Sequence, residues 1–202
     1  MLHSTTKIGL TLAAGIAGGF MLNASLAPSH ALQPEGEMPD MDEMMAQMAI
    51  LGTPNEHHEK LTRVVGEWDV NATFMMPDGS EMKGTGSMNC KQILDGRFIK
   101  TDFRMPEFMG MPFIGIGYNG YDNSTQSYQG VWMDSMSTKM FIMDGEFNSD
   151  GEYIATGATA HGTLMKIVQS MPDDDTIEDN FYDSMDGGAT WIQSGTMVYT
   201  RK

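Results

Sequence analysis

Methionine is the most unusual of the residues in this sequence that could do chemistry. The chain holds 22 methionines in 202 residues, and Met41, Met44, Met45 and Met48 fall on one face of a predicted helix. Thioether sulfurs select Cu(I), so this face is a candidate metal site. Methionine also fills irregular apolar space and makes adaptable binding surfaces. We favour this second interpretation, because soft-metal sites usually include histidine or cysteine as well.

The histidines fit known metal motifs poorly. Glu56-His57-His58-Glu59 places adjacent imidazoles on different faces of a helix, and Thr62 stands where a zinc protease would have its second histidine. We therefore expect a solvated polar helix there. His161 precedes a turn glycine, and we expect a surface histidine rather than a haem ligand.

Acid–base or nucleophilic chemistry has little support, and we assign no catalytic residue and no cofactor. No serine lies in a Gly-x-Ser-x-Gly elbow. Asp134, beside Trp132 and Ser135, could act as an acid or base only if a second titratable group faced it. An enzyme therefore stays an alternative to a binding protein.

The elements that position these residues are predicted to be strands. From Gly66 onward the apolar period is two, as in Trp68, Val70, Ala72 and Phe74. Nine turn signals, about a dozen residues apart, imply about ten sequential antiparallel strands. They fall at residues 77–79, 95–96, 110, 122–124, 135–137, 150–151, 162, 173–175 and 186–188.

Ten strands with one apolar face would leave two exposed edges unless the sheet closed on itself. We predict an all-β fold: an antiparallel up-and-down barrel of about ten strands with a short N-terminal helix. Its interior would be wide enough for a small ligand. A two-sheet sandwich is the alternative.

The N-terminal segment is predicted to direct export. Lys7 precedes an apolar run at residues 8–22, and Ser29 and Ala31 place small residues at both cleavage positions. The run is too short to span a bilayer. Residues 1–31 are thus a predicted signal peptide, cleaved near Ala31, and we expect an exported protein, periplasmic or extracellular, without stable membrane insertion.

The rest of the chain divides into two parts. Residues 32–52 are a Met-rich linker with a helix from Met41 to Leu51, and residues 53–202 are the barrel domain. A capping box at Thr53 is expected to begin the short helix before the first strand. The sequence does not indicate an oligomeric state.

The charge of the chain excludes one class of partner, and its single cysteine excludes an internal disulfide. The formal net charge of −15 repels nucleic acid, which we exclude as a partner. Cys90 is the only cysteine, so an internal disulfide is impossible. Its place in an alternating pattern predicts a buried thiol.

Seven short motifs follow one another in an order specific to one family. They are Gly66-Glu67-Trp68 and residues 93–98, 109–113, 120–123, 132–138, 173–176 and 199–202. Together they resemble the domain-of-unknown-function family 1579, over about residues 56–202. That family is similar to lipocalin-like (calycin) barrels and brings no established reaction. The resemblance therefore implies a fold more than a function.

The resemblance also suggests roles for particular residues. In lipocalin-like barrels the tryptophan of the first strand closes one end, and a basic residue of the last strand stacks on it. Trp68 and Arg201 are the structural candidates here. We predict a protein that binds a small, mostly apolar molecule, with Asp134 as a polar anchor. The candidate lining residues are Met109, Met111, Phe113, Trp132, Asp134 and Met136.

Overall fold

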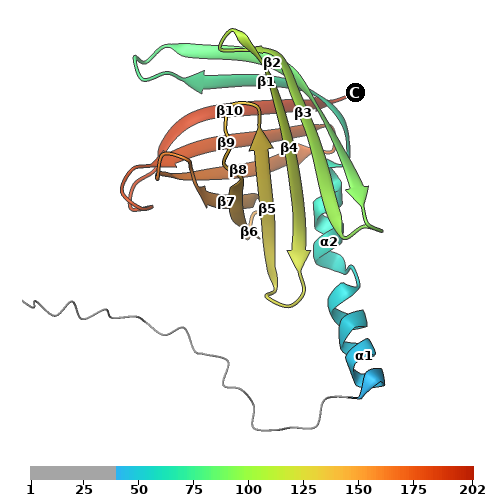
Figure 1. Ribbon diagram of the computed structural model, residues 1–202. Helices are drawn as coiled ribbons and strands as arrows, with labels where there is room; N and C mark the ends of the chain where they lie inside the picture. The colour runs from blue at the N-terminus through green and yellow to red at the C-terminus, as the bar shows by residue number, and fades with distance from the viewer. Residues whose placement is uncertain (1–39) are drawn as a thin grey trace, which may run out of the picture. The chain divides into compact units, whose positions relative to one another are not determined.

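The computed structural model describes residues 40–202, which form two α-helices, a short 3₁₀ turn and ten strands (Figure 1). The predicted signal peptide at residues 1–31 and the linker at residues 32–39 lie outside the described residues. Within residues 40–202, neither α-helix is long and apolar enough to cross a membrane.

The two helices precede the first strand. Helix α1 (Met41–Gly52) begins where expected, because the Asp40 carboxylate accepts a hydrogen bond from the backbone N–H of Glu43. Helix α2 (Glu56–Leu61) begins at a capping box on Asn55. The predicted box at Thr53 is wrong: the Thr53 hydroxyl instead donates to the carbonyl of Ala49 and closes α1.

Ten strands form one closed antiparallel barrel, in which each strand pairs with its neighbours in sequence and β1 pairs with β10. The predicted up-and-down barrel is confirmed. The strands are β1 (Gly66–Met75), β2 (Glu81–Ile93), β3 (Phe98–Phe108), β4 (Met111–Asp122), β5 (Ser127–Asp134), β6 (Phe141–Phe147), β7 (Tyr153–Ala158), β8 (Leu164–Asp173), β9 (Thr176–Ser184) and β10 (Ile192–Arg201).

Alternation explains which side chains form the interior. Trp68, Val70 and Ala72 of β1 are buried, whereas Asp69 and Asn71 between them are exposed. Close packing also depends on Gly115 of β4, because a Cβ there would overlap the indole of Trp132. The barrel wall can therefore hold a large aromatic side chain flat against its inner face.

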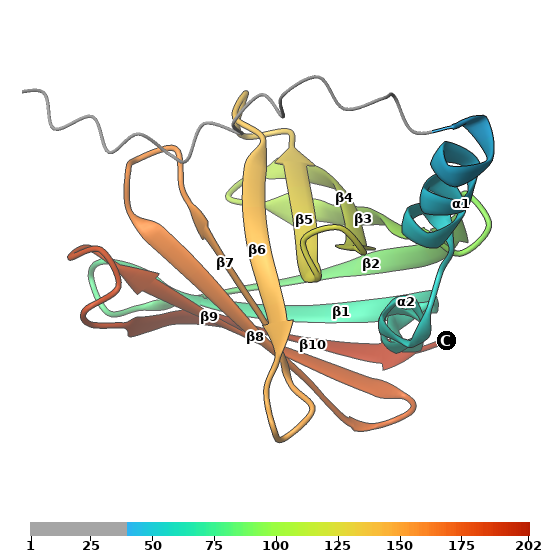
Figure 2. The same cartoon turned by 90° about the horizontal axis from the view of Figure 1, so that it is seen from below.

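Trp68 closes the end of the barrel nearest α2, beside which Figure 2 shows the start of β1 and the C-terminus. The indole is fully buried, and its N–H donates to the carbonyl of Val64 at 2.9 Å. The guanidinium carbon of Arg201 lies 4.1 Å from the centroid of the Trp68 ring. Arg201 also donates to the carbonyls of Val65 and Asp174, both at 2.9 Å. This end is thus tied to both chain termini of the barrel.

The other end of the barrel is a mouth. In an up-and-down barrel alternate turns share an end, so the turns after β1, β3, β5, β7 and β9 surround the opening opposite Trp68. Anything that enters the interior from this side passes between those turns.

Candidate functional site

A cavity of about 430 Å³ occupies the barrel interior. Pockets of this order hold small molecules. Most of its lining is apolar, and much is aromatic. The lining includes Phe74, Met88, Ile99, Phe103, Phe113, Trp132, Phe141, Met143, Phe147, Tyr153, Ala155, Met165, Ile167, Met171, Phe181, Met197 and Tyr199.

Aromatic rings crowd one part of this cavity. The Phe103 ring lies 5.9 Å from those of Phe113 and Trp132, centroid to centroid, and the Phe74 ring lies 5.7 Å from that of Phe181. Phe74 and Phe113 belong to strand ends at the mouth. A ligand there would meet ring faces and edges on several sides.

A polar cluster centred on Asp179 interrupts the apolar lining. Its carboxylate accepts a hydrogen bond from the Gln169 amide at 2.9 Å and one from the Tyr199 hydroxyl at 2.8 Å. The three residues come from β9, β8 and β10, and Asp179 and Tyr199 are buried. Asp179 lines the cavity, so its carboxylate is placed to meet a ligand.

Burial governs the electrostatics of this cluster. Loss of hydration raises the pKa of Asp179 to about 6, although the hydrogen bonds from Gln169 and Tyr199 oppose the rise. Burial likewise raises the pKa of Tyr199 well above its ordinary value. Asp179 is thus the group of the cluster that changes charge near neutral pH.

Two more polar side chains face the cavity. Cys90 is buried, as predicted, with its sulfur 3.3 Å from the Thr101 hydroxyl, and burial raises its pKa to about 11. The Tyr153 hydroxyl is buried without a hydrogen-bond partner among the described residues. An unpaired buried hydroxyl is costly, which makes Tyr153 a second candidate for contact with a ligand.

The six predicted lining residues divide into two groups. Phe113, Trp132 and Asp134 line the cavity. The Asp134 carboxylate accepts hydrogen bonds from the Trp132 indole at 3.1 Å and from the backbone of Met136 at 2.8 Å, so it holds the mouth loop. Met109, Met111 and Met136 are about half exposed and lie outside the cavity lining.

The predicted helix methionines are all on the surface. Met41, Met44, Met45 and Met48 are between 40% and 67% exposed, and α1 buries none of its residues. In residues 40–202 no three histidine, cysteine or acidic side chains come close enough to hold a metal ion. The Cu(I) site on the α1 methionines stays a prediction, since its ligands would be thioether sulfurs.

The two histidines of α2 are not solvated as expected, because they pack against the barrel. The His57 ring stacks on Tyr121 at 4.2 Å between centroids, and a ring nitrogen lies 3.0 Å from the Tyr128 hydroxyl. His58 is buried, and burial lowers its pKa. The prediction of a solvated helix is wrong here because both rings pack against aromatic residues of the barrel. His161 is exposed at the β7–β8 turn.

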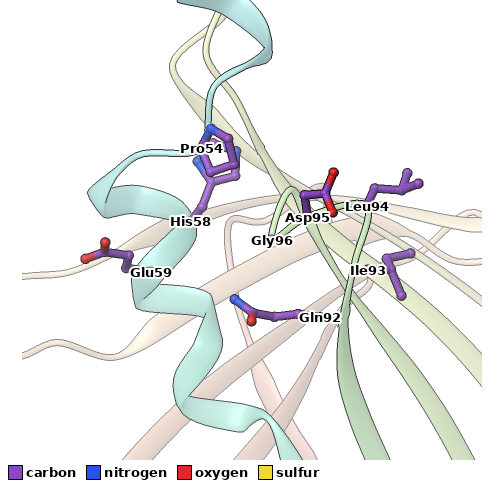
Figure 3. A pocket seen from close by; sticks show the side chains of 8 residues that line it. All are labelled: Pro54, His58, Glu59, Gln92, Ile93, Leu94, Asp95 and Gly96. Atoms are coloured by element: carbon purple, nitrogen blue, oxygen red, sulfur yellow. The ribbon is translucent and has the colours of Figure 1, made fainter.

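A second hollow, of about 620 Å³, lies between α2 and the β2–β3 turn (Figure 3). Gln92 points toward the helix, but Glu59 and Leu94 point away in opposite directions. Its lining side chains do not converge on one point. We therefore place the candidate site inside the barrel.

Sequence reasoning missed the polar cluster. Ile177, Asp179 and Phe181 alternate with Glu178 and Asn180 in β9. This alternation places Asp179 on the inward face of β9, and an acid at an inward position is the sequence signal that could have revealed the cluster.

Comparisons with known proteins agree with this fold. The model of the family described as "Protein of unknown function (DUF1579)" matches residues 53–201. No curated protein matches the sequence. The S-type phycobiliprotein lyase CPES from Guillardia theta is 10% identical, with a TM-score of 0.52 over 81% of this chain and 98% of that chain. Rv2717c from M. tuberculosis is 12% identical, with a TM-score of 0.55 over 74% and 99%. At these identities the similarity shows the fold alone.

Proposed function

Because the chain belongs to the family of proteins of unknown function DUF1579, which brings no activity, we propose its function from the barrel: it binds one small, mostly apolar molecule. The cavity of about 430 Å³ carries this proposal. A large, mainly apolar pocket with a few polar groups is the default binding site of a protein. The polar groups of the lining include Asp179, Gln169, Tyr199, the Tyr153 hydroxyl and, at the mouth, Asp134.

The mouth supports access for such a molecule. Methionines lie exposed at or next to the turns there, and flexible thioether side chains make adaptable apolar surfaces. They are Met75, Met109, Met111, Met136, Met140 and Met185. An apolar molecule that approaches this end would meet apolar side chains before it reached the interior.

A cavity-filling substitution tests the proposal. Ala155 is buried in β7 and lines the cavity, so Ala155→Phe would occupy part of the volume a ligand needs. We expect titration with the uncharged dye Nile red to give a saturable 1:1 fluorescence increase with the wild type. The dissociation constant of the dye should be at least about tenfold higher with the variant, a loss of about 1.4 kcal/mol of binding free energy.

The matched control for this experiment is Thr156→Phe, one position along the same strand. Thr156 is only half-buried and does not line the cavity, so the control should bind the dye as the wild type does. Circular dichroism checks that both variants fold. Equal binding by Ala155→Phe and the wild type would place the dye outside the barrel and contradict the proposal.

Export is part of the same proposal, since residues 1–31 have the pattern of a signal peptide. If the full chain is expressed in a bacterial host, we expect protein recovered from outside the cytoplasm to begin at Leu32. N-terminal sequencing or an intact mass measures this. Recovery of the uncleaved chain in the cytoplasm alone would contradict it.

A further inference from the structure

The Asp179 carboxylate is a buried charge in contact with the cavity. Both of its hydrogen bonds come from neutral donors, the Gln169 amide and the Tyr199 hydroxyl. Neutral donors orient a carboxylate but supply no opposite charge. An ionised group held away from water in this way is costly unless a cation joins it.

No cation of the described chain does so. The five ion pairs within residues 40–202 all involve other carboxylates, those of Glu81, Asp95, Asp102, Asp175 and Asp69. Basic residues do reach the cavity lining, but their side chains are exposed. Lys60 lies over the Phe147 ring, Lys139 donates to the carbonyl of Thr159, and Arg63 is the third basic residue of the lining.

Other titratable groups near Asp179 keep the same charge across neutral pH. Tyr199 of β10 and Cys90 of β2 interact with it, and burial raises the pKa of both, so both stay neutral. Gln169 of β8 does not titrate. Of these groups only Asp179 carries a charge near neutral pH. The other carboxylate of the lining, Asp134, lies at the mouth, where it accepts hydrogen bonds from the Trp132 indole and the backbone of Met136.

We propose that the molecule bound in the barrel is an apolar amine, whose protonated ammonium group pairs with the carboxylate of Asp179. This inference rests on the proposed function. The ammonium would supply the opposite charge that the Asp179 carboxylate lacks. The hydrocarbon part of the ligand would lie among aromatic residues such as Phe181 and Phe103. A carboxylic acid would bring two negative charges together. A neutral hydrocarbon would leave the Asp179 charge unpaired.

Two matched molecules test this with the whole mature protein. We expect 2-(aminomethyl)naphthalene to bind at least about tenfold more tightly than 2-(hydroxymethyl)naphthalene at pH 7.5, by isothermal titration calorimetry. Asp179→Asn should bring the two affinities to parity, mainly by weakening the amine. Glu178→Gln, which removes an exposed carboxylate next to it in β9, should leave the preference unchanged.

The wild type offers a second measurement that needs no variant. The advantage of the amine should fall about tenfold for each pH unit below the pKa of Asp179, because the protonated carboxyl has no charge to offer. Binding of both molecules with equal affinity, at every pH and in Asp179→Asn alike, would overturn the amine inference and leave the cavity proposal standing. Binding of neither molecule, and of no dye, would overturn both.

Discussion

Replacing Trp68 by alanine should lower the free energy of unfolding by about 3–5 kcal/mol, the range for large aromatic side chains removed from a core. The indole is fully buried, so alanine would leave a cavity at the closed end of the barrel. It would also leave the Val64 carbonyl without its donor and the Arg201 guanidinium without a ring to lie on. Urea unfolding followed by circular dichroism measures the loss.

Trp191 provides the control for this substitution. It is half-buried after the β9–β10 turn, where Lys166 lies 4.4 Å from its ring centroid. Trp191→Ala removes an equally large side chain but should cost only about 1–2 kcal/mol, because the Trp191 ring stays partly exposed and its cation–π contact is worth about 0.5–1 kcal/mol. A loss that small for Trp68→Ala would mean that the closed end does not depend on the indole.

The fold was predictable because its rules are local. Period-two alternation and regularly spaced turn residues are properties of short segments, and together they specified a closed meander. The residue at which α2 begins could not be predicted from short-range sequence. Thr53 and Asn55 can both cap a helix, and Asn55 also donates to the side chain of Asn123, 68 residues further along the chain. No short-range pattern distinguishes the two.

The same reasoning predicts only some of the residues that line the site. Phe113 and Trp132 lie in the inward phase of their strands and line the cavity, whereas Met109 and Met136 belong to loops at the mouth and stay exposed. Alternation could have placed Asp179 inside. That Gln169 and Tyr199 face it depends on register between three strands, which pairs Gln169 with Asp179 and Tyr199 with Ile177. Sequence alternation does not give cross-strand register.

Asp179 also makes the stability of the fold depend on pH in an unusual direction. Burial raises its pKa from 3.8 to about 6, so between these values the folded chain holds a proton that the unfolded chain has lost. The free energy of unfolding therefore falls as pH rises through this window, and the full cost of the ionised group applies above about pH 6. A shift of about two pKa units corresponds to about 3 kcal/mol.

Replacing Asp179 by asparagine should consequently stabilise the protein by up to about 3 kcal/mol at pH 8 and by almost nothing at pH 4. The amide keeps an oxygen for the Gln169 donor, and its NH₂ can donate to the Tyr199 hydroxyl oxygen. Urea unfolding at pH 4, 6 and 8 measures the difference between variant and wild type. Asp78, Asp122 and Asp186 also make stability depend on pH, because hydrogen bonds lower their pKa values. Their contribution is the same in both proteins and cancels in the difference.

Glu178→Gln is the matched control, because this exposed carboxylate should change stability little at any of the three pH values. Saturation with the naphthyl amine should then stabilise the wild type more than Asp179→Asn at pH 8, since a ligand stabilises the folded state in proportion to the logarithm of its concentration over its Kd. If the variant were instead less stable than the wild type at pH 8, the carboxylate would be stabilised by the fold itself. In that case it would need no cation from a ligand, and the case for an amine would fall with it.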